Sequence, residues 1–458
     1  MSRVRPEILG LGRDTLYIAI WQGSIAVADF VQIALVARGL GLSNYGQLAV
    51  VISGVTLVAQ LFDLRTGWAT TVYSTRYLTR GDGRRALGVI QFGFVLQAAS
   101  TALAVTCVLG VASLLGDRLG VREGALLAAV YCGVFPLGVI SDTGFTTLRV
   151  LDRFANIAWT GVAVEIVRVV LLAFCVLSFG SLMSVVIALV VYEAVKAIAA
   201  GAVAAHAVGR ELHYSILDTD AIGSVSSKWA IARASAHTNV LSYARLIQNQ
   251  APPLVMAAIG TTAQVGLYKV AAAVATMIAK MVEPASSAIL PRIARLVEFN
   301  NYRRLDGLVR QATIGAGGVL VLSYGVVLLF RTDILKALGG DAAVLAGSAV
   351  AIMGIAQVLN GTVFWNYPLL MAGHRSGLVA LSTAAGALLQ IALLPILFLE
   401  LGVTGAAIAY CSGVVAANTL ATAWAVRLLG ARRSGSVRSG VSRHNDLQPP
   451  LISSEESV

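Results

Sequence analysis

The chain places an arginine and a row of polar side chains in the middle of an otherwise apolar segment. This stretch, residues 233–253, reads RASAHTNVLSYARLIQNQAPP. Residues at helical spacing share one face of a helix, and here that face is polar: Ser235, Thr238, Ser242, Arg245 and Asn249. An arginine at the centre of a bilayer costs about 2.5–3.5 kcal/mol on insertion scales, so its side chain faces protein or water. We interpret this face as the lining of a hydrophilic transport cavity; the alternative is a helix buried in a bundle whose neighbours satisfy its polar groups.

Two further helical stretches carry polar faces. In residues 262–291 the polar face contains Lys269, Thr276, Lys280 and Glu283. In residues 46–75 it contains Ser53, Thr56, Gln60 and Asp63. We expect cations, amides and a hydroxyl to bind the substrate: Arg245, Lys269, Lys280, Gln60, Gln248, Asn249 and Ser242. The acids Asp29, Asp63 and Glu283 are the candidates for ion coupling or gating. Asp63 and Glu283 lie near helix ends, so the alternative for both is a cytoplasmic gate or an ion pair with loop arginines such as Arg65 or Arg292.

Two pairs of opposite charges lie at i,i+3 spacing within apolar segments. They are Glu165 with Arg168, and Glu193 with Lys196. This spacing lets the two charges neutralise each other on one helix. We therefore favour a structural role for both pairs over a role in transport.

The chain lacks the motifs of enzymes and of ATP-driven pumps. It contains no GxxxxGK[ST] phosphate loop, no HExxH sequence and no nucleophile elbow. Its four cysteines stand singly in apolar runs, without metal-binding spacing. We expect no catalytic residues, no metal, no cofactor and no enzymatic activity.

The composition is that of a polytopic membrane protein. Of 458 residues, 57% are hydrophobic and only 12% are charged, whereas soluble domains are about a quarter charged. A spanning helix needs about 20 mainly apolar residues, which predicts an all-α fold with twelve membrane helices: 15–37, 46–75, 86–115, 122–148, 154–178, 182–208, 229–259, 262–291, 305–330, 342–371, 376–400 and 403–429.

Basic residues concentrate in alternate loops, which predicts the orientation. One set of loops carries most of the arginines, including Arg84, Arg153 and Arg304, and the other carries few. By the positive-inside rule, both termini are expected in the cytoplasm. The net charge of +11 then marks cytoplasmic loops rather than nucleic-acid binding. We divide the chain into a first six-helix bundle (1–208), a cytoplasmic connector (209–228), a second bundle (229–430) and a disordered cytoplasmic tail (431–458).

The two bundles are expected to be copies of one another. Matching residues recur at offsets of 220 to 222 along the whole chain: Gly46 with Gly266, Thr56 with Thr276, Asp63 with Glu283, Arg84 with Arg304, Arg153 with Arg375, and Gly180 with Gly402. A six-helix repeat preserves orientation, so the copies are parallel. Secondary transporters built this way bind their substrate at the interface between the halves.

Three segments resemble one family of transporters. They are GLGLSNYGQLAVVISGVTLVAQLFDL, TTAQVGLYKVAAAVATMIAKMVEPASSAILPRIARL and LELGVTGAAIAYCSGVVAANT. Together they resemble the Wzx-like flippases for O-antigen and exopolysaccharide repeat units, in the multidrug/oligosaccharidyl-lipid/polysaccharide exporter superfamily. The chain departs from many relatives at Pro252, near which they carry an acid.

The resemblance implies a MATE-like fold in the bacterial cytoplasmic membrane. It also implies alternating-access transport of an undecaprenyl-diphosphate-linked oligosaccharide from the inner to the outer leaflet, among membrane lipids. Arg245 is then the expected phosphate ligand, because a guanidinium binds phosphate oxygens through two parallel hydrogen bonds. A polysaccharide polymerase and a chain-length regulator are the partner proteins expected from this resemblance.

Three other functions suit a polytopic protein of this kind. A lipid II flippase and a cation-coupled multidrug exporter would share the fold. A polysaccharide polymerase would need a long outward loop with catalytic arginines, and the outward loops here are all short.

Overall fold

The computed structural model describes residues 4–433, apart from residues 63, 65, 119–122, 216–217, 219, 224, 226–227, 300 and 374. The described residues form helices and turns, with no strand among them. The N-terminal half contains α1 (Val4–Gly39), α2 (Leu42–Phe62), α3 (Gly67–Leu78), α4 (Gly83–Arg118), α5 (Gly124–Tyr131), α6 (Val134–Val150), α7 (Phe154–Phe179) and α8 (Leu182–Glu211). After the short α9 (Asp220–Gly223), the C-terminal half contains α10 (Lys228–Ile259), α11 (Thr262–Lys280), α12 (Glu283–Glu298), α13 (Tyr302–Leu329), α14 (Arg331–Gly339), η1 (Asp341–Ala346), α15 (Gly347–Thr362), α16 (Asn366–Ala372) and α17 (Ser376–Arg433).

These helices make the twelve crossings that the sequence predicts. Ten segments of the described chain are long and apolar enough to span a membrane. One of them, α17, is broken at Gly402, whose φ of 59° is outside the helical range, and it therefore provides two crossings. The twelfth is α10, which is 32 residues long but more polar than the others. Its helix continues through Pro252 and Pro253.

The two halves break their helices at equivalent places. The second crossing is α2 followed by α3 in one half and α11 followed by α12 in the other. The fourth crossing is also split, into α5 and α6 and into α15 and α16. Gly180 and Gly402 both adopt positive φ, at 56° and 59°, where the fifth crossing turns into the sixth. Positive φ favours glycine, so both halves use a glycine at this turn, although ψ differs between them, at 24° for Gly180 and −137° for Gly402.

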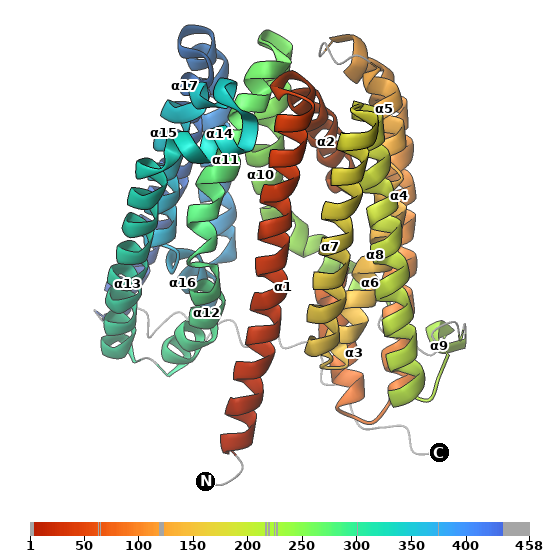
Figure 1. Ribbon diagram of the computed structural model, residues 1–458. Helices are drawn as coiled ribbons and strands as arrows, with labels where there is room; N and C mark the ends of the chain where they lie inside the picture. The colour runs from red at the N-terminus through yellow and green to blue at the C-terminus, as the bar shows by residue number, and fades with distance from the viewer. Residues whose placement is uncertain are drawn as a thin grey trace, which may run out of the picture.

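The halves lie side by side, with α4 and α8 on one flank and α13 and α15 on the other (Figure 1). They meet closely at the end where α2 and α11 begin, which we name the closed end. A Cβ atom on Gly46 would lie 1.7 Å from the carbonyl oxygen of Thr262, and one on Gly266 would lie 2.2 Å from that of Leu42. The glycine pair that marks the sequence repeat thus lets the two backbones touch.

The distribution of buried side chains shows how the halves are joined. At the closed end, one apolar core includes Val36, Leu48, Val265 and Leu338 and so combines both halves. At the opposite end, each half has a core of its own, around Leu148 in the first and Ile293 in the second. A smaller cluster at that end also joins the halves, because Ile231 of α10 packs with Ala69 and Val89. The halves therefore share their larger core at the closed end and are joined less extensively at the other.

Candidate functional site

A cavity of about 260 Å³ lies between the halves, lined by residues of α1, α2, α10, α11, α15 and α17. Its polar lining consists of tyrosines, amides, one threonine and one lysine: Tyr45, Tyr268, Tyr410, Gln248, Asn249, Gln250, Gln357, Thr276 and Lys269. No carboxylate is among its lining residues. This cavity offers hydrogen-bonding groups, aromatic surfaces and one positive charge.

Hydrogen bonds within the C-terminal half fix part of this lining. The Gln357 amide donates to the hydroxyl of Tyr410 at 2.7 Å. The buried Gln390 amide donates to the backbone carbonyl of Gln248 at 3.1 Å. The side-chain oxygen of Gln250 is buried and has no hydrogen-bond partner among the described residues. Because an unsatisfied buried acceptor costs about 1–3 kcal/mol, Gln250 is suited to accept a hydrogen bond from a ligand hydroxyl.

Lys269 supplies the positive charge of the cavity. It is partly buried in α11, and the described residues include no ion-pair partner for it. A charge removed from water without a partner is costly. Lys269 is therefore available for an acidic or strongly polar ligand group.

Arg245 lies on α10 one turn before the cavity. It is exposed, and its guanidinium carbon lies 5.6 Å from the ring centroid of Tyr367. A helix rises about 1.5 Å per residue, so Gln248 and Asn249 are about 4.5–6 Å farther along the axis. Arg245 is thus outside the lining of the cavity but adjacent to it, held over an aromatic ring.

Asp29 joins the two halves through ion pairs. Its carboxylate accepts from Arg168 of α7 at 2.8 Å and lies 3.6 Å from Lys280 of α11. Arg168 also pairs with Glu165 at 2.9 Å, and the hydroxyl of Tyr192 donates to Glu165 at 2.9 Å. Asp29 is consequently balanced by one cation from each half.

The second predicted pair adjoins this cluster. Lys196 lies 2.7 Å from Glu193, whose carboxylate also accepts from Ser141 at 2.9 Å. Arg168 and Lys196 both lie 5.4 Å from the ring centroid of Tyr192. Both i,i+3 pairs predicted from the sequence form, and one tyrosine connects them.

The predicted site residues fall into three groups. Gln248, Asn249 and Lys269 line the cavity, and Arg245 is one turn away. Lys280 and Asp29 form an ion pair outside the cavity lining, and Gln60 is partly buried on α2. Asp63 and the side chains of Ser242 and Glu283 lie outside the described residues.

Sequence reasoning missed the aromatic part of the cavity. Tyr45 directly precedes Gly46, and Tyr268 follows Gly266 by two residues. Both tyrosines are buried beside the closed end. Their proximity to the repeated glycines could have identified them as residues near the interface between the halves. Tyr410 lies in an apolar stretch, and nothing in the sequence around it indicates a cavity.

Comparison with known proteins decides the family. Residues 11–297, more than half of the chain, match the model of a family described as "Polysaccharide biosynthesis protein". The chain belongs to this family. A curated relative, "Inner membrane protein YghQ" of Escherichia coli (strain K12), is 27% identical over 154 residues, which cover 32% of this chain and 43% of the relative.

Solved structures of membrane transporters share the fold of this family member. An inward-facing multidrug resistance MATE family transporter of the MOP superfamily matches with a TM-score of 0.76 and 15% identity, over 91% of this chain and 99% of that one. The lipid II flippase MurJ, in an inward closed conformation, matches with a TM-score of 0.67 and 13% identity, over 92% and 90% of the two chains.

The family and the fold together identify a multi-pass membrane protein of the polysaccharide biosynthesis family with the fold of these transporters. They confirm the family resemblance and the MATE-like fold of two six-helix repeats that the sequence predicts.

Proposed function

We propose that this protein moves an undecaprenyl-diphosphate-linked oligosaccharide from the inner to the outer leaflet of the bacterial cytoplasmic membrane. The observation that carries the proposal is the cavity between the halves, with its tyrosines, amides and Lys269, next to an exposed Arg245. The family description and the lipid II flippase among the structural relatives support a lipid-linked substrate.

The side chains suit the two polar parts of such a molecule. Amides both donate and accept hydrogen bonds, as sugar hydroxyls require, and Gln248, Gln250 and Gln357 lie together in the cavity. A diphosphate crossing hydrocarbon unaided would lose its hydration at a large cost. Arg245 offsets that cost, since its guanidinium matches phosphate oxygens with two hydrogen bonds.

The spacing along α10 fits the order of groups in the substrate. In a prenyl-diphosphate sugar, the first sugar is bonded directly to the phosphate. Arg245 lies about one helical turn from Gln248 and Asn249. We therefore assign the first sugars to the cavity and the diphosphate to Arg245, while the prenyl chain remains in lipid.

The arrangement of the halves suits alternating access. The larger shared core lies at the closed end and a smaller one at the opposite end, so alternating access requires the halves to part at the first and pack more closely at the second. With both termini in the cytoplasm, the closed end faces outward. An inside-negative potential favours outward movement of an anion by about 2.3 kcal/mol per charge per 100 mV. Asp29, which is shared between Arg168 and Lys280, is our candidate for coupling to an inward cation.

In this function the protein leaves its substrate chemically unchanged and passes it to a polymerase and a chain-length regulator. Depletion of the protein tests it. We expect undecaprenyl-linked repeat units to accumulate on the cytoplasmic leaflet, and the structure of that glycolipid identifies the cargo. Unchanged amount and sidedness of these lipids after depletion would refute the proposal. Accumulation of lipid II together with arrested cell-wall synthesis would show that the cargo is lipid II.

A further inference from the structure

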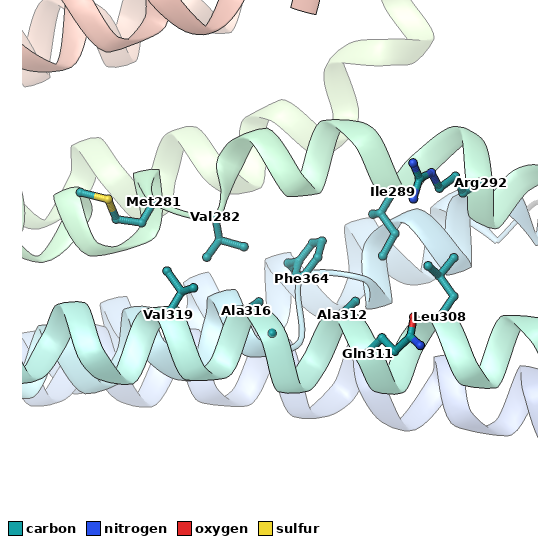
Figure 2. Close-up of a pocket in the computed structure, with 11 residues that line it drawn as sticks. Met281, Val282, Ile289, Arg292, Leu308, Gln311, Ala312, Ala316, Val319 and Phe364 are labelled. Atoms are coloured by element: carbon teal, nitrogen blue, oxygen red, sulfur yellow. The ribbon is translucent and has the colours of Figure 1, made fainter. Parts of the chain in front are cut away.

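A second cavity lies within the C-terminal half, away from the candidate site. It is a groove of about 410 Å³ between α11–α12 and α13, with Phe364 at its back (Figure 2). It shares no lining residue with the cavity between the halves. The groove runs lengthwise beside α13 (Figure 2).

Small residues on one face of α13 create this groove. Ala312, Gly315 and Ala316 recur at helical spacing and form its floor, between Leu308 and Val319. A Cβ atom on Gly315 would meet nothing within 4 Å. The missing side-chain volume leaves an apolar channel along a membrane-spanning helix.

The groove is polar at one end only. Arg292 and Gln311 lie at that end, whereas Met281 and Val319 lie at the other (Figure 2). Arg292 is the one charged residue of the lining, it is exposed, and the described residues provide no ion-pair partner for it. An apolar channel that ends at an exposed guanidinium matches a hydrocarbon chain that ends at a phosphate.

We propose that the groove binds an acyl chain of an anionic phospholipid, with the lipid phosphate on Arg292. Two observations favour a membrane phospholipid over the tail of the transported molecule. The groove has its own cation, distinct from Arg245, and it is separate from the cavity assigned to the glycan. By the positive-inside rule, Arg292 lies at the cytoplasmic leaflet, where anionic headgroups concentrate.

The chain offers two pairs of matched variants for a test. Gly315→Leu fills the groove, whereas Gly318→Leu adds the same side chain on the same helix where the cavity is absent. Both glycines are exposed, and a Cβ atom on either meets nothing within 4 Å. Arg292→Ala removes the headgroup ligand, and Arg295→Ala removes another exposed arginine one turn later on α12, outside the groove.

The experiment uses the full chain in lipid nanodiscs that contain phosphatidylglycerol with a photoreactive acyl chain. We expect the cross-linked peptides to come mainly from residues 308–319, and Gly315→Leu to reduce this labelling about tenfold while Gly318→Leu does not. Native mass spectrometry of lipids retained after detergent extraction should show a preference for phosphatidylglycerol over phosphatidylethanolamine. Arg292→Ala should abolish that preference, and Arg295→Ala should leave it unchanged.

Three results would overturn the proposal. The first is labelling spread equally over all lipid-facing helices, and the second is equal retention of the anionic and zwitterionic lipids by the wild type. The third is displacement of phosphatidylglycerol by an equimolar amount of undecaprenyl diphosphate, which would make the prenyl tail the occupant. None of these results depends on transport, so failure here is distinguishable from failure of the proposed function.

Discussion

Arg168 and Lys269 are both cations placed in apolar helices, and the protein satisfies them in different ways. Arg168 is surrounded by Asp29, Glu165 and the ring of Tyr192. Lys269 faces the cavity, with no ion pair among the described residues. We infer that Arg168 serves mainly stability and that Lys269 serves mainly binding.

Arg168→Leu should destabilise the fold strongly. The side chains of Arg168 and Glu165 are only 10% and 8% exposed, and removing one partner of a buried pair costs about 3–5 kcal/mol. Unfolding in mixed detergent micelles measures this loss. In the exposed pair of Arg85 with Asp82, Arg85→Ala should cost less than about 1 kcal/mol. Equal losses in the two variants would show that the pair of Arg168 and Glu165 is not buried as described.

Lys269→Met should reduce transport without reducing stability, unlike Arg168→Leu. Transport should fall at least about tenfold, which corresponds to a loss of 1.4 kcal/mol of binding, because the cavity loses its one charge. Thermal stability should remain equal or increase, since a partly buried charge without an ion pair among the described residues is removed. Lys336→Met, at an exposed lysine of α14, is the control and should change neither quantity. Normal transport by Lys269→Met would remove the residue from the binding site.

Among the features of the secondary structure, the six-helix repeat is predicted most completely from the sequence. Hydropathy predicts the twelve crossings because it depends on local composition. The repeated glycines predict the equivalence of the halves because they mark backbone conformations that recur. The spacing of Gly180 and Gly402 alone predicts that they occupy equivalent positions, and both adopt positive φ. Tyr410 could not be predicted as a cavity residue in the same way, because its contact with Gln357 depends on how α15 packs against α17.

The approach of α2 to α11 at Gly46 leads to a prediction about conformation. In Gly46→Ala, the new methyl group would overlap the carbonyl oxygen of Thr262, and such overpacking costs about 1–3 kcal/mol. We expect the closed end to open, with its closed population reduced roughly 5–150-fold relative to the open one. The yield of a disulfide between cysteines placed at positions 43 and 262, in a background without the four natural cysteines, measures that population.

Gly23→Ala is the matched control for this substitution. Gly23 lies in α1, where a Cβ atom meets nothing within 4 Å, so the disulfide yield should stay at the parental level. A parental yield in Gly46→Ala as well would contradict the close approach at the closed end.

In the molecule as a whole, the two halves are expected to move as separate bodies and to part at the closed end. The hydroxyl oxygens of Ser43 and Thr262 lie 3.0 Å apart across the halves. A disulfide between Ser43→Cys and Thr262→Cys should therefore form readily and arrest transport in this state. Reduction should restore transport, and each single cysteine variant should be unaffected by oxidation. Full transport by the cross-linked protein would show that this end does not open.

We propose that the protein carries a lipid-linked anionic glycan past Arg245. The most direct measurement is the leaflet distribution of undecaprenyl-linked repeat units in depleted cells that express wild-type or Arg245 variants at equal levels. We predict that Arg245→Ala leaves the repeat units on the cytoplasmic leaflet, that Arg245→Lys gives an intermediate distribution because an ammonium binds phosphate as a point charge, and that the wild type restores the outer pool. Wild-type distribution in cells with Arg245→Ala would contradict this account.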